Sequence, residues 1–182
     1  MEKNIWQLLP FIWINDMTNL DPIKLEAERI EEDCLYSAKG HFCAGHWWGK
    51  VNFWLGISST SLSAIAGTSA LSQFDYHNVI AGALSIFVAF LAGLITFINP
   101  DNRSFAHLKA GNNYNSLRNN ARIFHDIETG RVDEKTAIKI LKKLNETRNK
   151  LNTESLQIPE WAFKKARKGI ELGEASYRAD KN

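Results

Sequence analysis

The chain has 182 residues, of which 45% are hydrophobic and 23% are charged, and its formal net charge is +2 at pH 7. A net charge this small does not suggest a protein that coats duplex nucleic acid through a broad basic surface. With only Cys34 and Cys43, the sequence does not indicate a fold held together by disulfides.

The N-terminal segment, residues 1–21, contains an apolar, tryptophan-bearing run at residues 5–14 with Pro10 in its middle. A secretory signal peptide would show a more basic start, a longer apolar stretch and a small-residue cleavage site. We therefore expect this segment to stay uncleaved. Its role is open between packing or lying in the membrane interface and forming a plug or gate beneath the two apolar stretches that follow.

Residues 22–50 are predicted to form a cytoplasmic, juxtamembrane helix. Asp21 and Pro22 suit the cap and first turn of a helix. The apolar residues then follow an approximate helical repeat, at Leu25, Ile30, Leu35, Ala38 and Phe42. We expect this helix to run directly into the apolar segment that begins at Val51.

Residues 51–100 contain two uncharged stretches, 51–74 and 76–100, which are separated only by Asp75. Each is long enough to cross a bilayer as a helix, which takes roughly 20 apolar residues. Aromatic residues such as Trp47 and Trp54 lie at their edges, where amphipathic rings favour the headgroup zone. The pattern predicts a transmembrane helical hairpin. The alternative is that the first stretch, which is diluted by Ser and Thr, is a core helix of a soluble bundle.

The orientation of this hairpin follows from the basic residues near its ends. Lys39 and Lys50 precede the first stretch, Arg103 and Lys109 follow the second, and the connecting turn has no Lys or Arg. The positive-inside rule then places both termini in the cytoplasm and Asp75 outside.

One face of the first stretch has candidate pore-lining residues. Projected on a helix, Ser58, Ser61, Ile65, Thr68, Ser69 and Ser72 lie on one side. Hydroxyls on this face would wet a narrow lumen, and a ring of Ile65 side chains would close it by dewetting. The alternative is that the hydroxyls bond back to carbonyls one turn earlier and only pack.

The remaining surfaces of the hairpin suit packing and lipid. Small residues gather on the other side of the first stretch, as at Gly56 and Ala66, and recur in the second, as at Ala81 and Gly93. The large residues of the second stretch, Leu91 among them, suit lipid. In an oligomer Asp75 would form a ring of carboxylates at the outer mouth and concentrate cations. The alternative is that Asp75 only keeps the turn in water.

Residues 101–182 are predicted to be a cytoplasmic helical region. The Asn99-Pro100 step should break the second stretch, because proline disfavours helix in the residue before it. Helices are expected over residues 103–127, 133–151 and 160–177, with a linker at 152–157. No segment shows convincing strand alternation, so the predicted fold is an all-α membrane protein in which a helical bundle adjoins a two-helix hairpin.

Basic side chains of this region are the candidate phosphate ligands, since guanidinium groups pair with phosphate oxygens and lysines add point charge. They are Arg118, Arg122, Lys164, Lys165, Arg167 and Lys168. The alternatives are a solvated helix face or attraction to anionic headgroups. The sequence shows no convincing catalytic motif. On a helix, only Cys43 and His46 of the set His41, Cys43 and His46 lie on one side, whereas zinc usually takes three or four protein ligands. We expect neither an enzyme nor a cofactor or metal.

Three runs, together with the aromatic entry to the hairpin, resemble the SLATT domain, a bacterial family of two-span membrane proteins of conflict systems. They are residues 25–33 (LEAERIEED), 107–119 (HLKAGNNYNSLRN) and 157–162 (QIPEWA). The resemblance covers residues 22–177 and brings no catalytic residues. It implies a pore-forming anti-phage effector of the bacterial inner membrane, gated by a nucleotide-type signal from a partner nucleotidyltransferase, whose opening depolarises the cell and arrests or kills it.

Two helices cannot enclose an aqueous path, so a pore requires a homo-oligomer, which we expect to be a tetramer or larger. The contrasting hypothesis is a membrane-anchored scaffold that oligomerises without conducting.

Overall fold

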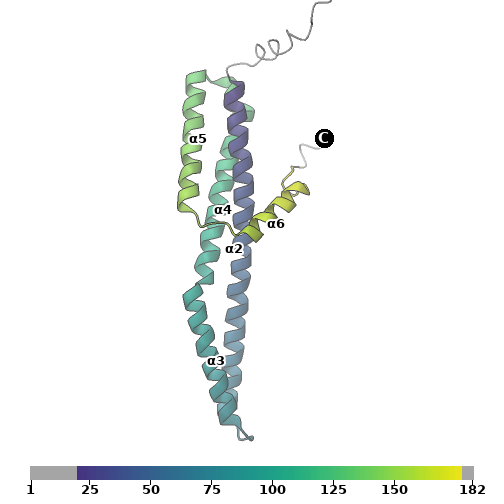
Figure 1. Ribbon diagram of the computed structural model, residues 1–182, viewed down its shortest axis with the longest axis vertical. Helices are drawn as coiled ribbons and strands as arrows, with labels where there is room; N and C mark the ends of the chain where they lie inside the picture. Colours follow the sequence, from purple (N-terminus) through teal and green to yellow (C-terminus); the bar gives the residue numbers. More distant parts are fainter. Residues whose placement is uncertain (1–19, 178–182) are drawn as a thin grey trace, which may run out of the picture.

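The computed structural model describes residues 20–177, which are helical throughout except for short turns (Figure 1). The elements are α2 (Asp21–Ala70), α3 (His77–Ile98), α4 (Pro100–Ile123), a π-helical turn η2 (Phe124–Glu128), a 3-10 turn η3 (Thr129–Arg131), α5 (Glu134–Glu154) and α6 (Glu160–Glu171). The all-α class is confirmed for these residues, which contain no strand. The predicted roles of residues 5–14 lie outside the described residues.

α2 is a single helix of 50 residues that runs nearly the whole length of the molecule (Figure 1). Its continuity confirms that the helix expected over residues 22–50 passes directly into the first apolar stretch, so the predicted division at residue 50 lies inside one helix. α4 packs along the first half of α2, and α3 packs along the second half. We call residues 21–50 of α2 with α4, α5 and α6 the helical bundle, and residues 51–70 of α2 with α3 the apolar arm.

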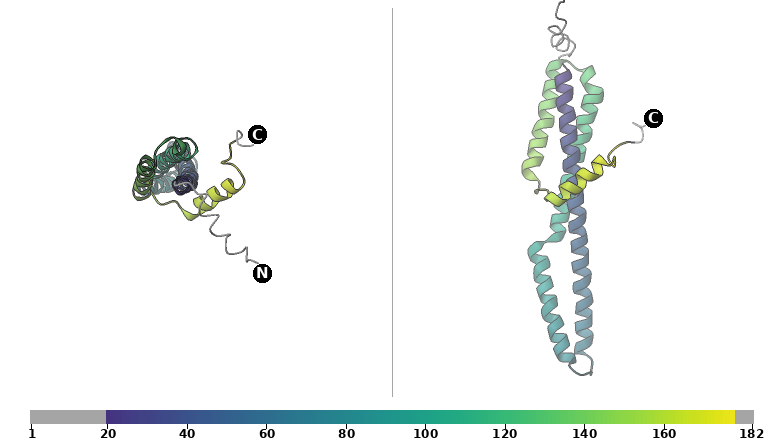
Figure 2. Two further views of the ribbon diagram at one scale, coloured as in Figure 1. Left: turned by 90° about the horizontal axis from the view of Figure 1, so that it is seen from above. Right: turned by 45° about the vertical axis from the view of Figure 1, so that its right-hand side comes forward.

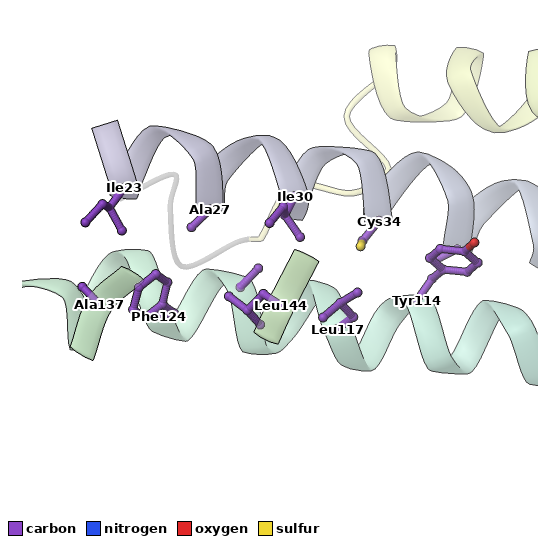
Figure 3. Packing of buried hydrophobic residues seen from close by; sticks show 11 residues of the cluster. Ile23, Ala27, Ile30, Cys34, Tyr114, Leu117, Phe124, Ala137 and Leu144 are labelled. Atoms are coloured by element: carbon purple, nitrogen blue, oxygen red, sulfur yellow. The ribbon is translucent and has the colours of Figure 1, made fainter. Parts of the chain in front are cut away.

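The hydrophobic core lies in the helical bundle, where α2, α4 and α5 meet (Figure 3). Residues three or four apart on a helix share one face, and the core follows that spacing on each helix. Its buried members are Ile23, Ala27, Ile30, Cys34 and Ala38 of α2, Tyr114, Leu117 and Ala121 of α4, Phe124 of η2, and Ala137 and Leu144 of α5. Most are small or medium-sized, which lets α2 and α4 approach closely.

The break between α3 and α4 lies at Asn99, as predicted. Asn99 has a φ of 48°, a left-handed conformation that asparagine tolerates better than most residues. Its side chain accepts a hydrogen bond from the Asn102 backbone N–H at 3.3 Å, and Pro100 occupies the first turn of α4. The chain therefore changes direction where the apolar arm meets the helical bundle.

The first apolar stretch is helical as far as Ala70, after which the chain turns toward α3. One predicted helix end was wrong by several residues. α6 ends at Glu171 rather than near residue 177, because Gly173 adopts a φ of +81°. The N–H groups of Gly173 and Glu174 donate to the carbonyls of Ile170 and Gly169, which is the Schellman pattern of a glycine-terminated helix.

Candidate functional site

The apolar arm exposes its large hydrophobic side chains. Among the described residues, one helical stretch, His77–Arg131, contains a window long and apolar enough to cross a membrane, and 11% of that window is buried. The core helix of a soluble protein would be mostly buried instead. Exposed large side chains occur on both helices of the arm, at Phe53, Trp54, Ile57, Ile65, Val79, Ile80, Ile86, Phe87, Phe90 and Phe97.

The first apolar stretch, residues 51–74, belongs to a helix that does not pass the same test of length and composition. Its Ser and Thr residues lower the hydropathy. It nevertheless packs along α3 through buried positions of both helices, Ala66 and Ser69 of α2 and Ala81 and Leu91 of α3. The expectation that Leu91 faces outward was wrong, because this side chain is covered within the helix pair.

Most residues of the predicted pore face lie open in the single chain. Ser58, Ser61 and Thr68 are exposed, and Ile65 is 52% exposed. Ser69 differs: it is buried, because it lies on the flank of this face that turns toward α3. Ser72 is half-buried. The structure therefore leaves four of the predicted residues on one uncovered stripe and places Ser69 outside it.

Two hydroxyls of the predicted pore face donate to backbone carbonyls of α2. Thr68 donates to the Ala64 carbonyl at 2.8 Å, and Ser72 donates to the Thr68 carbonyl at 2.7 Å. This is the back-bonding considered above as the alternative to a lumen. A hydroxyl that donates in this way keeps its lone pairs, so it can still accept a hydrogen bond from water.

The glycines of the arm make no close helix–helix contact within the chain. A Cβ atom added at Gly56, Gly67, Gly82 or Gly93 would meet nothing within 4 Å. Close backbone approach at these positions is therefore available to another helix but is not made by the helices of this chain.

The turn at the tip of the arm carries Asp75, which is exposed. Next to it, Tyr76 has a φ of 64° and the ring of Phe74 contacts that of His77, with centroids 5.9 Å apart. Asp75 is therefore the charged group at the end of the arm farthest from the helical bundle (Figure 1).

Aromatic and basic side chains meet where the arm joins the bundle. The ring centroids of Trp47 and Trp161 are 5.4 Å apart, and those of Trp47 and Trp48 are 4.7 Å apart. The Arg103 guanidinium lies over Trp48 at 5.1 Å, and its Nε donates to the Ile98 carbonyl at 2.9 Å. Arg103 thus satisfies a carbonyl at the end of α3 that the break at Asn99 leaves without its helical partner.

In the helical bundle, a pair of buried histidines joins α2 to α4 close to this aromatic and basic cluster. The Nδ1 atoms of His41 and His107 are 2.9 Å apart, and the side chains are 1% and 3% exposed. The His41 ring stacks on Tyr114, whose hydroxyl donates to Asn152 of α5 at 2.8 Å. Burial, followed by the neighbouring His107, lowers the pKa of His41 to about 4. Burial also lowers the pKa of His107, with Arg103 adding to the effect.

The sequence did not reveal this pair. The sequence places His41 beside Cys43 and His46, while its partner His107 lies 66 residues away. The signal available was that His41 and His107 both lie on the buried helical repeats, in phase with Ala38 and Tyr114. Among the described residues no group of three or more His, Cys, Asp or Glu side chains is placed to hold a metal ion.

The predicted phosphate ligands do not converge on one place. Arg118 and Arg122 line a hollow of about 490 Å³ with Glu31, Asp126 and Tyr177. Arg167 lines a different hollow of about 670 Å³. Its other lining residues, which the sequence analysis did not select, include Arg148, Asp33 and Tyr114. Lys164, Lys165 and Lys168 line neither hollow.

Several of these basic groups already have partners. Arg118 Nε donates to Glu31 at 3.3 Å, and Lys164 pairs with Glu160 at 2.6 Å. The guanidinium of Arg122 lies 4.7 Å from the centre of the Tyr177 ring, with Arg118 over the same ring at 5.6 Å. Among the predicted ligands, Arg118 and Arg122 therefore share a hollow.

Comparison with known proteins adds no relative. No protein-family model matches the chain, and neither a curated protein nor a solved structure matches it. The resemblance to the SLATT domain stays a prediction from the three sequence runs.

Proposed function

We propose that the protein is a two-span membrane protein whose subunits assemble into a pore. The observation that supports this most is the apolar arm: it leaves large hydrophobic side chains uncovered on both helices and keeps hydroxyl groups on one open stripe of α2. Such a surface is unfavourable in water but is suited to lipid and to neighbouring subunits.

Both helices of the arm would cross the bilayer together. α3 has 22 residues, which at 1.5 Å per residue gives a length of roughly 33 Å, close to the thickness of a hydrocarbon core. α2 packs along α3, so embedding α3 puts residues 51–70 of α2 in the same layer. Between residues 51 and 100 the only Asp, Glu, Lys or Arg is Asp75, at the tip.

The same arm favours a homo-oligomer. A pair of helices cannot surround water, so a conducting path needs several copies around an axis. The open glycines Gly56, Gly67, Gly82 and Gly93 offer close contact to helices of other subunits. In this arrangement Ser58, Ser61 and Thr68 face the axis, and Ile65 forms the apolar constriction.

The cellular role follows from the SLATT resemblance and from charge. Lys39, Lys50, Arg103 and Lys109 flank the arm on the bundle side, so the bundle and both termini face the cytoplasm of a bacterial cell. A nucleotide-type signal from a partner enzyme acts on the bundle and gates the pore, and the resulting depolarisation serves anti-phage defence. The proposal includes no enzymatic activity.

Leakage of a small dye from liposomes containing the purified protein tests the pore. Replacing Ile65 by glycine removes the apolar constriction, so Ile65→Gly should leak more than the unaltered protein. Ile86→Gly is the matched control, because Ile86 is an exposed isoleucine on α3 and not on the hydroxyl stripe. Equal leakage from both variants would refute a gate at Ile65.

The second candidate is a membrane-anchored scaffold that does not conduct. The back-bonded hydroxyls of Thr68 and Ser72 favour it, since they are already satisfied within the helix. Replacing Ser58, Ser61 and Thr68 together by leucine separates the two. Arrest of bacterial growth that persists in this variant supports the scaffold, whereas loss of arrest with intact oligomers supports the pore.

A further inference from the structure

α6 lies against the middle of α2 through its smallest residues. Ala162, Ala166 and Gly169 are its buried positions. Just before the helix, the Ile158 side chain covers Gly40, where an added Cβ would lie 3.1 Å from it. α6 then leaves α2 obliquely, so one of its long sides stays uncovered (Figures 1 and 2).

The two flanks of α6 have different residues. At 100° per residue, Trp161, Lys165, Lys168 and Leu172 share one flank, and Phe163 and Arg167 lie on the other. All of them are exposed. We call the first set the lysine flank.

Two aromatic contacts show which way each flank faces. Trp161, on the lysine flank, has its ring centroid 5.4 Å from that of Trp47, close to the apolar arm. Phe163, on the other flank, has its centroid 6.3 Å from that of Tyr36. Tyr36 precedes Trp47 on α2 by roughly three helical turns, about 16 Å farther from the arm. The lysine flank therefore faces the arm.

The basic residues of α6 differ in whether a carboxylate neutralises them. Lys164 pairs with Glu160 at 2.6 Å, and Arg167 pairs with Glu171 at 3.8 Å. Within the described residues, Lys165 and Lys168 have no carboxylate within ion-pair distance. The unneutralised charge of the helix thus lies on the flank that faces the arm.

We infer that the lysine flank binds the phosphate groups of anionic phospholipids in the leaflet next to the helical bundle. The inference rests on the proposed membrane embedding of the arm. Trp47 and Trp161 then lie at headgroup level, where indole rings are favoured, and Lys165 and Lys168 reach down to the lipid phosphates.

Lipid rather than a free phosphate compound is the partner because of shape. Lys165 and Lys168 line neither hollow in which the arginines of the bundle lie. They extend from an open helix side that continues the aromatic and basic surface of Trp47, Trp48 and Arg103. An exposed helix side outside these hollows suits a layer of headgroups better than a single small molecule.

Lysine acetylation by a water-soluble reagent, read by mass spectrometry, tests the inference on the full chain in nanodiscs. Lys165 and Lys168 should react about fivefold more slowly when part of the lipid is anionic than when all of it is zwitterionic. Lys139 and Lys142 are the internal controls, because they are exposed on the part of α5 far from the arm and should react equally in both.

Each outcome has a distinct meaning. A protein that stays in the nanodisc while Lys165 and Lys168 react equally in both lipids overturns the lipid inference alone. Protection of these lysines by millimolar ATP in zwitterionic nanodiscs overturns it in favour of a free phosphate ligand. A protein that cannot be retained in nanodiscs at all refutes the membrane proposal as well.

A variant pair gives a second measurement. Anionic phospholipid that co-purifies with the protein in mild detergent should fall several-fold in Lys165→Glu/Lys168→Glu. It should be unchanged in Lys139→Glu/Lys142→Glu, which reverses the same amount of charge away from the arm. Equal lipid content in the two variants would contradict the inference.

Discussion

At the scale of single residues, the buried histidine pair imposes a condition on protonation. An imidazole that donates its N–H to another imidazole needs the acceptor to be neutral. His41 and His107 are 2.9 Å apart and both are buried, so the folded state requires at least one of them uncharged. The positive charge of Arg103 on the same helix also disfavours protonation of His107.

This pair predicts that acid destabilises the helical bundle. In the unfolded chain a histidine binds a proton near pH 6.5, whereas the pKa of folded His41 is about 4. The full stability is present above pH 6.5. It should fall as the pH drops from 6.5 to 4, by about 1.4 kcal/mol per pH unit for each histidine that stays neutral.

Urea unfolding in detergent, followed by tryptophan fluorescence at several pH values, measures this slope. His41→Phe should flatten it, because that variant has one fewer group to protonate. The control is His46→Phe, since His46 is exposed on the same helix and its removal should leave the slope unchanged. The same slope in both variants would contradict a role of the pair.

Gly45, where α2 packs against α4, gives a prediction on packing. A Cβ atom at Gly45 would lie 2.8 Å from the Leu108 side chain and 3.2 Å from the Leu108 backbone nitrogen. The second neighbour is backbone and cannot rotate away. Gly45→Ala should therefore lower the free energy of unfolding by about 1–3 kcal/mol. Gly130→Ala, in an exposed turn outside the apolar arm where a Cβ meets nothing within 4 Å, should leave it unchanged or raise it. Thermal unfolding in detergent compares them.

At the scale of elements, the sequence predicted helix starts and breaks that depend on neighbouring residues, but it did not predict contacts between residues far apart in the chain. The start of α2 at Asp21 and Pro22 and the break at Asn99-Pro100 depend on neighbours in the chain, so the sequence predicted them. The end of α6 also depends on a local feature, the positive φ of Gly173, but the apolar residues Leu172, Ala175 and Tyr177 beyond the helix concealed it. The contacts of His41 with His107 and of Trp47 with Trp161 need the fold itself.

For the candidate site too, the sequence predicted which residues share a helix face but not how the helices pack against one another. The helical period was enough to group Ser58, Ser61, Ile65 and Thr68 on one face. It was not enough to place Ser69, because the edge of the α2–α3 contact depends on how α3 is rotated. The basic residues were grouped by type, but α4 and α6 direct them into separate surroundings.

The hollow beside α4 gives a prediction for ligand binding. Among the described residues, Arg122 has no carboxylate within ion-pair distance, and its guanidinium lies over the Tyr177 ring. A phosphate group can therefore pair with this guanidinium without displacing a carboxylate from it. In the proposed nucleotide-gated pore, Arg122→Gln should weaken nucleotide binding about tenfold.

Calorimetric titration of the purified protein with candidate nucleotides measures that change. Lys164→Gln is the control, because Lys164 is paired with Glu160 and lies outside both hollows. Unchanged affinity in Arg122→Gln would remove this hollow as the ligand site.

At the scale of the whole molecule, α2 is the mechanical link between the two halves. It passes from the helical bundle into the apolar arm without interruption, so in the proposed pore a tilt of its first half would move the stripe that contains Ile65. The return path through α3 and α4 is broken at Asn99, which allows the angle between those helices to change.

The far end of the molecule gives the last prediction. In an assembly around an axis, every subunit contributes one Asp75 to the same mouth, and a ring of carboxylates concentrates cations there. Asp75→Asn should reduce the preference for cations, seen as a reversal potential closer to zero across a salt gradient. The effect should be largest in dilute salt, because the Debye length is about 30 Å at 0.01 M and about 10 Å at 0.1 M.

The control for this prediction removes a carboxylate elsewhere. Glu146→Gln changes the net charge equally, but Glu146 is exposed on α5, in the half of the molecule away from the tip. A reversal potential that shifts in Asp75→Asn and not in Glu146→Gln assigns the selectivity to the mouth rather than to overall charge. If neither variant shifts it, Asp75 serves only to keep the turn in water, and any ion preference must arise along the stripe of hydroxyls.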